Sequence, residues 1–115
     1  MGEEGEEGRL PQNFETFDHY DPVNMVATSI KSYDVRNGYS NPQDFYNAVK
    51  TDIDAVADFD SYELSGLKLD SSIIDARFLD VNLPADASRA RMVALENAIT
   101  YAGRRGVNIT TGFWQ

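Results

Sequence analysis

The chain has 115 residues, enough for one domain that buries about two thirds of the surface its unfolded chain would expose. Its apolar content of 42% is ordinary for a globular protein, and no apolar run approaches the ~20 residues that a membrane-spanning helix needs. The sequence contains no cysteine, which excludes disulfides and thiolate metal sites.

The charge of the chain is unevenly spread. The net charge is −9, which is unfavourable for binding a polyanion. Residues 1–70 hold 15 acidic and 5 basic residues, whereas residues 71–115 hold 4 acidic and 5 basic ones. We expect the acidic side chains to be solvated, and a surface that attracts a basic partner protein is the alternative. They gather in the N-terminal tail and at Asp52, Asp54, Asp58 and Asp60, which are expected on the wet face of a helix.

The first part of the chain predicts a tail followed by two strands. Residues 1–9, rich in glycine and glutamate, predict a disordered acidic tail, and residues 10–115 predict the folded domain. The aromatic-rich residues 14–20 and the alternating residues 25–33 predict strands, separated by turn residues at 21–24. Strand alternation places Ser29, Lys31 and Tyr33 on one face of the second strand and Val26, Thr28 and Ile30 on the other.

A helix is predicted over residues 41–60. Asn41 is a good N-cap, Pro42 suits the first helical position, and Asp44 favours the positive end of the helix dipole. Apolar residues then recur at helical spacing, at Phe45, Val49, Ile53, Val56 and Phe59.

The second half predicts a hairpin, a strand, a helix and a last strand. Residues 62–69 read as two short strands joined by a Ser-Gly turn, and residues 76–83 as a strand that Pro84 stops. A helix over 88–105 follows, and residues 107–111 form a last strand parallel to the preceding one. Asp86 or Ser88 caps this helix, Gly106 ends it, and its expected inner face is Met92, Leu95, Ile99 and Ala102.

These elements predict an α/β (α+β) domain with two or three layers. Both helices have one apolar stripe, so we expect them to flank a central mixed sheet. The strands of this sheet are 14–20, 25–33, 77–83 and 107–111, and the hairpin protrudes from it.

Three residues on the first two strands suggest a chemical site. If these strands pair, Asp18, Ser29 and Lys31 gather at one end of the sheet, where a carboxylate beside a lysine can hold a divalent metal and polarise a phosphodiester. Strands that carry D…(D/E)-x-K form the core of PD-(D/E)XK nucleases. The bare pattern is common, and the structural alternatives are a turn cap for Asp18, a core-edge hydroxyl for Ser29, and an ion pair of Lys31 with Asp34 or Asp21.

Several segments, in their order, resemble one class of contact-dependent growth inhibition toxins, the nuclease domains at the C-terminus of CdiA-type effectors. The segments are LPQNFETFD at 10–18, ATSIKSYD at 27–34, NPQDFY at 41–46, NLPAD at 82–86 and AITYAGRRGVNI at 98–109. The resemblance implies a PD-(D/E)XK-like fold and metal-dependent DNA cleavage, with an RNA-cleaving relative as an alternative. It covers roughly residues 9–110.

The resemblance also implies roles for the three residues. Asp18 would be a carboxylate ligand to a divalent metal, and Ser29 would be a weaker ligand in place of the second acid. The metal would be zinc, with magnesium as the alternative. Lys31 would position the attacking water or stabilise charge on phosphorus. Members of the family carry a further glutamate on an upstream helix, and here that region alternates glycine with glutamate, which disfavours a helix. A non-catalytic interaction domain that keeps the toxin fold is therefore the alternative function.

The predicted partners are DNA and a cognate immunity protein. A hairpin that exposes leucines and unpaired edges invites strand addition, although it could also fold back on the domain. The resemblance implies that this arm enters a pocket of the immunity protein. The residues of the arm are Tyr62, Glu63, Leu64, Ser65, Gly66, Leu67, Lys68 and Leu69. We expect its leucines, Leu64, Leu67 and Leu69, to be exposed. We expect a monomer, or a heterodimer with the immunity protein. The domain would belong to a secreted or cell-surface effector that acts in the cytoplasm of a target bacterium.

Overall fold

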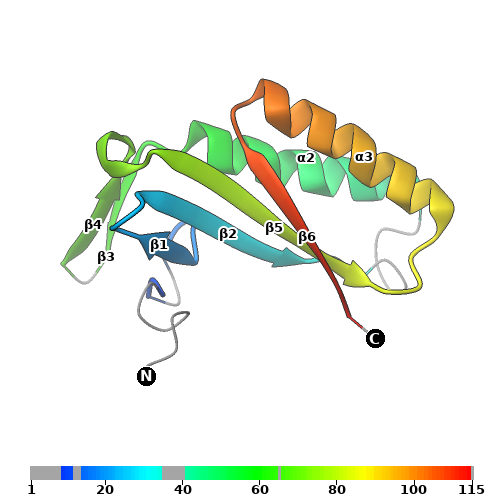
Figure 1. The fold of residues 1–115 in the computed structure, drawn as a ribbon, viewed down its shortest axis with the longest axis horizontal. Helices are drawn as coiled ribbons and strands as arrows, with labels where there is room; N and C mark the ends of the chain where they lie inside the picture. Colours follow the sequence, from blue (N-terminus) through cyan, green and yellow to red (C-terminus); the bar gives the residue numbers. More distant parts are fainter. Residues whose placement is uncertain (1–8, 12–13, 35–40, 65, 115) are drawn as a thin grey trace.

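The computed structural model describes residues 9–11, 14–34, 41–64 and 66–114, which form a two-layer α+β domain. One layer is a four-stranded sheet in the order β1-β2-β5-β6, and the other consists of two helices that lie on one face of the sheet (Figure 1). Within the described ranges, no helix combines the length and the apolar character needed to cross a membrane. The acidic tail at 1–8 lies outside the described residues, and the boundary at residue 10 stays a prediction.

The sheet is mixed, as predicted. β1 (His19–Asp21) runs antiparallel to β2 (Val26–Ser32). β2 runs parallel to β5 (Ala76–Pro84), which runs parallel to β6 (Asn108–Trp114). Because the parallel pairs need crossover connections, the two helices occupy the intervals before and after β5 and cover the same face.

The predicted strand at 14–20 is wrong except at its end. Thr16 adopts a left-handed backbone with φ of 68°. The N–H of Phe17 donates to the carbonyl of Glu15 at 2.7 Å, and that of Phe14 donates to Pro11 at 2.9 Å. The segment therefore turns and inserts Phe14 and Phe17 into the core. Its aromatic residues are there because they are buried, and they do not indicate a strand.

Helix α2 (Pro42–Asp58) matches the prediction closely. The N–H of Asp44 donates to the side chain of Asn41 at 2.8 Å, which satisfies one unpaired amide of the first turn. At the other end, the Arg77 guanidinium donates to the carbonyls of Val56 and Ala57 at 2.7 and 2.8 Å. The last turn of the helix carries no basic residue of its own, so Arg77 supplies the cation that the negative end of the dipole favours. The buried stripe is Phe45, Val49, Ile53 and Val56, as predicted.

Helix α3 (Arg89–Arg104) begins at Ser88, whose hydroxyl accepts from the N–H of Arg91, so Ser88 rather than Asp86 is the cap. Its predicted inner face is partly wrong, because Ile99 is 42% exposed. Ile99 follows Ala98 in the sequence, and the rotation of about 100° per residue places it at the edge of the buried stripe. The stripe is made of Leu95 and of three alanines, Ala94, Ala98 and Ala102, whose small side chains let the helix pack closely.

The predicted hairpin is present as a separate two-stranded sheet, β3 (Ser61–Leu64) and β4 (Leu67–Asp70), at one end of the molecule (Figure 1). Gly66 follows Ser65 with φ of 82°, a conformation that glycine adopts without strain, and Ser65 itself lies outside the described residues. A short 3₁₀ turn (Ser71–Ile73), capped by Asp70, fills the stretch left unassigned from the sequence.

The expected exposure of the hairpin leucines is correct for Leu67 and wrong for Leu64 and Leu69. Leu67 is 42% exposed, whereas Leu69 is only 2% exposed and Leu64 is half-buried. Leu69 pairs across the hairpin with Tyr62, whose ring meets Phe14 edge-on at 5.0 Å between centroids. One face of the hairpin, with Tyr62, Leu64 and Leu69, is therefore docked on the core, whereas Leu67 at the tip is exposed.

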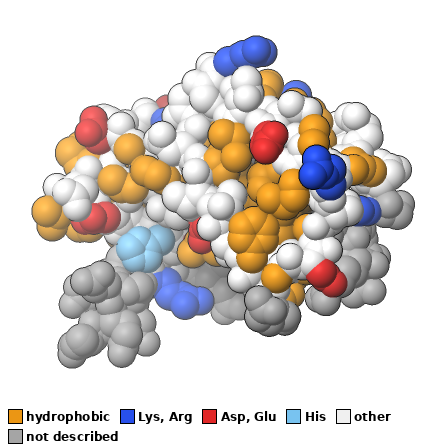
Figure 2. All heavy atoms as spheres, turned by 45° about the vertical axis from the view of Figure 1, so that its right-hand side comes forward, with side chains coloured by type: hydrophobic (Ala, Val, Ile, Leu, Met, Phe, Trp, Pro, Cys, Tyr) orange, Lys and Arg blue, Asp and Glu red, His pale blue; other side chains and the backbone are white. Residues whose placement is uncertain are grey.

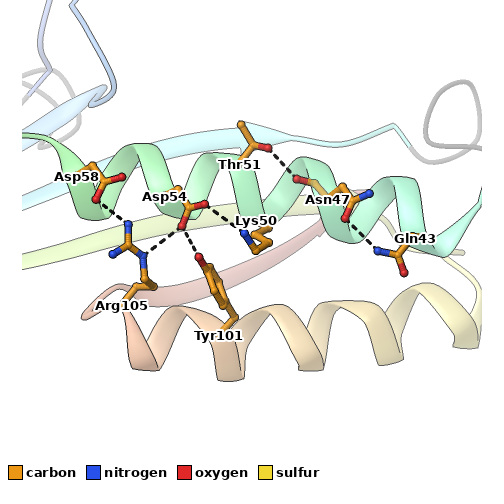
Figure 3. A network of polar contacts seen from close by, with 8 residues as sticks. All are labelled: Gln43, Asn47, Lys50, Thr51, Asp54, Asp58, Tyr101 and Arg105. Atoms are coloured by element: carbon orange, nitrogen blue, oxygen red, sulfur yellow. Dashed lines mark hydrogen bonds and ion pairs between the residues drawn. The ribbon is translucent and has the colours of Figure 1, made fainter.

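The aspartates of α2 were expected on its solvated face, but Asp54 and Asp58 bind Tyr101 and Arg105. Asp54 accepts hydrogen bonds from the Tyr101 hydroxyl at 2.5 Å and from Arg105 Nε at 3.2 Å, and Lys50 lies 3.5 Å away (Figure 3). Arg105 also donates to Asp58 at 2.6 Å. This network joins α2 to α3, and the hydrogen bond from Tyr101 is the main reason why the pKa of Asp54 is lowered.

Replacing Asp54 with alanine should lower the free energy of unfolding at pH 7, and the difference from the unaltered chain should shrink in acid. A carboxyl group whose folded pKa is lowered stabilises the protein above its unfolded pKa, near 4, and this contribution is lost as the pH falls through the lower folded value. Urea unfolding of both proteins at pH 7, 4 and 3 measures the effect. Asp60→Ala, at an exposed position, is the control, and a difference that is equal at every pH would contradict the assignment.

Candidate functional site

Pairing of the first two strands brings Asp18 next to Ser29. Asp18 directly precedes β1 rather than closing a strand, and the register His19 to Thr28 continues to it. The Asp18 N–H donates to the carbonyl of Thr28 at 2.9 Å, and the Ile30 N–H donates to the Asp18 carboxylate at 2.7 Å. The aspartate is thus fixed to the backbone on both sides of Ser29.

Ser29 presents a buried hydroxyl without a partner. The residue is 1% exposed, on the face of β2 that the helices cover, and its Oγ makes no hydrogen bond within the described part of the chain. Leaving a buried hydroxyl unsatisfied costs about 1–3 kcal/mol, so such a group in a folded protein calls for an explanation. The position of this hydroxyl suits an oxygen ligand to a cation that is also bound by the Asp18 carboxylate.

Lys31 lies on the same face of β2 as Ser29, about 6.6 Å further along the strand. Unlike Ser29, it is exposed, because the three residues of β1 pair only with Val26, Ala27 and Thr28 and leave the end of β2 uncovered on that side. The alternative ion pair with Asp21 is disfavoured. The Asp21 carboxylate instead accepts from the N–H groups of Val23 and Asn24 and from the Asn24 side chain, and these bonds lower its pKa.

The structure therefore brings together the three residues singled out in the sequence, and their roles stay predictions. Carboxylate and hydroxyl oxygens suit hard divalent cations, and zinc also accepts carboxylates. Among the described residues, no group of three histidine, cysteine or acidic side chains could hold a metal. The glutamates at 3, 4, 6 and 7 lie outside the described residues.

Sequence analysis missed one contact near this site. Strand alternation placed Tyr33 on the face of Ser29 and Lys31 without giving it a role, and Asp52 was expected to be solvated. In the structure, the Tyr33 hydroxyl donates to Asp52 of α2. Nothing in the sequence pairs Tyr33 with Asp52, because that contact depends on how α2 lies on the sheet.

Comparisons with known proteins agree with this architecture. A family model described as a CDI toxin restriction endonuclease-like domain matches residues 2–112. The chain is 40% identical over 106 residues to deoxyribonuclease CdiA-o11 of Escherichia coli O157:H7 (strain EC869) and 34% identical over 104 residues to deoxyribonuclease CdiA of Yersinia pseudotuberculosis serotype O:3 (strain YPIII). These alignments cover 90% and 89% of the chain, which spans 28% and 10% of the two relatives' own lengths.

A solved structure is similar over nearly the whole domain. The CdiA-CT/CdiI toxin and immunity complex from Yersinia pseudotuberculosis matches with a TM-score of 0.88 and 32% identity, covering 94% of this chain and 89% of that one. The match confirms the mixed α+β fold predicted from the sequence. The chain belongs to the family of CDI toxin restriction endonuclease-like domains.

Proposed function

We propose that the chain is a metal-dependent DNA endonuclease, the toxin domain of a contact-dependent growth inhibition system. The observation that carries the proposal is the unpartnered, buried Ser29 hydroxyl between an aspartate and a lysine on paired strands. The names of the two relatives, both deoxyribonucleases, support DNA as the substrate.

The three residues divide the work of phosphodiester cleavage. Asp18 and Ser29 would hold a divalent cation through a carboxylate and a hydroxyl oxygen, and such a cation would supply polarisation of the phosphate and a lowered pKa of bound water. The Lys31 ammonium stabilises the negative charge that develops on the phosphate or orients the attacking water. The resemblance to the toxin family implies that the metal is zinc, whereas a site made of oxygen ligands favours magnesium.

The charge distribution limits how the domain binds DNA. With a net charge of −9, the domain depends on local cations, and on the face drawn in Figure 2 the blue side chains stand apart, without a continuous basic stripe. If few phosphates are neutralised at once, the dependence of DNA affinity on salt should be shallow, and this is the dependence that we expect.

Cleavage of supercoiled plasmid by the purified 115-residue chain tests the proposal. We expect nicking with Zn²⁺ or Mg²⁺, inhibition by EDTA, and no cleavage of a transfer RNA under the same conditions. Loss of nicking in Asp18→Ala and Lys31→Ala would support the assigned roles. A folded chain that leaves plasmid intact with both metals, or that cleaves only the RNA, would overturn the proposal.

A second candidate function is binding without cleavage. It is favoured by the ligand set of the described residues, which offers Asp18 and Ser29 but no group of three acidic, histidine or cysteine side chains. A chain that binds a DNA fragment and an immunity protein, yet nicks no plasmid with either metal, would have this function instead.

The proposed partner is a cognate immunity protein that binds the hairpin residues 62–69. The similar solved structure is a toxin–immunity complex, and the unpaired edges of a two-stranded sheet suit strand addition. Binding there would inhibit by blocking substrate access rather than by filling the metal site. The domain would be delivered by a cell-surface effector and act in the cytoplasm of the target bacterium.

A further inference from the structure

Two tyrosine–aspartate hydrogen bonds tie helix α2 to its neighbours, one on each flank. Tyr101 of α3 donates to Asp54, and Tyr33, which directly follows β2, donates to Asp52. Both contacts are partly buried and have the same chemistry. They differ in position, because Tyr33 lies two residues after Lys31 on the same face of the strand, whereas Tyr101 faces the other helix (Figure 3).

Tyr33 is held by more than its hydroxyl. Its side chain is 2% exposed, its ring meets Phe45 of α2 edge-on at 5.6 Å, and its N–H donates to the carbonyl of Asn82 at 2.9 Å. Ring packing, the sheet and the hydroxyl therefore fix one residue from three directions, and a shift of Tyr33 would displace the end of β2.

The backbone of Lys31 is held on one side only, by β5, where Lys31 pairs with Val81 and Ser32 pairs with Asn82. On the β1 side, strand pairing has already ended. On the β5 side, the Asn82 side chain donates to the Lys31 carbonyl at 3.3 Å. The Asn82 oxygen lies only 2.3 Å from the point where a Cβ on Gly112 would be, so glycine in β6 makes room for this amide. The ladder with β5, the Asn82 side chain and Tyr33 together hold the last residues of β2.

We propose that Tyr33 and Asp52 are positioning residues for Lys31. Their hydrogen bond keeps the end of β2 against α2 and so holds the lysine ammonium beside Ser29 and Asp18. The inference rests on the proposed nuclease function. A displacement of about 1 Å in a catalytic group can slow a reaction up to about 100-fold, so loss of this one contact should be visible in the rate.

Four variants of the full chain test the proposal in the plasmid assay. Tyr33→Phe and Asp52→Ala each remove the hydrogen bond, and we expect kcat to fall about tenfold while KM changes less than about twofold. Asp52→Asn still offers an oxygen to the tyrosine hydroxyl and should keep kcat within about threefold of the unaltered chain. Tyr101→Phe breaks the matched contact on the other flank of α2, and we expect it to lower thermal stability without changing kcat. The double variant Tyr33→Phe with Asp52→Ala should be no slower than either single one, because both remove the same contact.

Hydrogen exchange of residues 30–34 gives a second measure that does not depend on activity. We expect faster amide exchange there in Tyr33→Phe than in Tyr101→Phe. Equal rates of cleavage in Tyr33→Phe and the unaltered chain, or unchanged exchange in this segment, would overturn the proposal. So would an Asp52→Asn variant as slow as Asp52→Ala, because Asp52 would then act through its charge. Absence of cleavage by the unaltered chain would overturn the proposed function, and the exchange measurement would still decide whether the contact holds the strand.

Discussion

Replacing Lys31 with alanine should reduce plasmid cleavage by about 100-fold or more. Lys31 is the cation that strand alternation places on the same face of β2 as Ser29, and a charge aimed at the reacting phosphate contributes more to a rate than to stability. Because the side chain is exposed, the thermal midpoint should move by less than about 2 °C. Nicking rates at saturating plasmid, together with circular dichroism melts, measure both quantities.

Two further variants separate charge from geometry at this site. Asp18→Asn keeps an oxygen for the N–H of Ile30 and should fold normally, yet lose cleavage as fully as Asp18→Ala, because a carboxamide is a weak ligand for a divalent cation. Lys31→Arg keeps the charge in a different shape and should recover only part of the activity. Cleavage that survives in both Asp18→Asn and Lys31→Ala would mean that the catalytic site lies elsewhere.

Removing the tip of the hairpin should lower affinity for the cognate immunity protein by about 100-fold or more, as expected when a central part of an interface is lost. The suitable variant replaces residues 63–68 with Asn-Gly. This keeps Tyr62 and Leu69, which pack on the core, and closes the shortened hairpin with a tight turn. Titration calorimetry measures the affinity, and plasmid nicking shows that the domain still folds.

A surface change away from the hairpin controls for nonspecific effects. Val23 in the turn between β1 and β2 is the most exposed large apolar residue described, and Val23→Ser should leave the affinity unchanged. If the shortened hairpin binds the immunity protein as tightly as the unaltered chain while remaining folded, residues 62–69 are not in the interface.

The elements of this fold that are predictable from the sequence have strong local signals. The start of α2 is fixed by Asn41 and Pro42, and its buried face follows from apolar residues at helical spacing. The alternation of β2 correctly places Ser29 and Ile30 on opposite faces, and the structure shows that the face of Ser29 is the buried one. In the site, the pairing of Asp18 with Ser29 is predictable, since only a turn separates the two strands.

The features that sequence analysis missed depend on tertiary contacts. Residues 14–18 are aromatic enough for a strand, but a left-handed Thr16 lets both phenylalanines reach the core. Ile99 is more apolar than Ala98, yet close packing of α3 favours the smaller side chain. The contact between Tyr33 and Asp52 joins a strand and a helix whose relative placement no local pattern encodes.

The hairpin forms its own ladder and shares no strand with the sheet that carries Ser29 and Lys31. Beyond Tyr62 and Leu69, its outward side chains, such as Glu63 and Lys68, face solvent as a cross-strand pair. Substitutions at such positions change folding stability by only about 0.5 kcal/mol. Sequence drift can therefore remodel this arm while the framework of the fold stays intact, which leaves the recognition of partners and the chemistry of the domain open to separate evolutionary change.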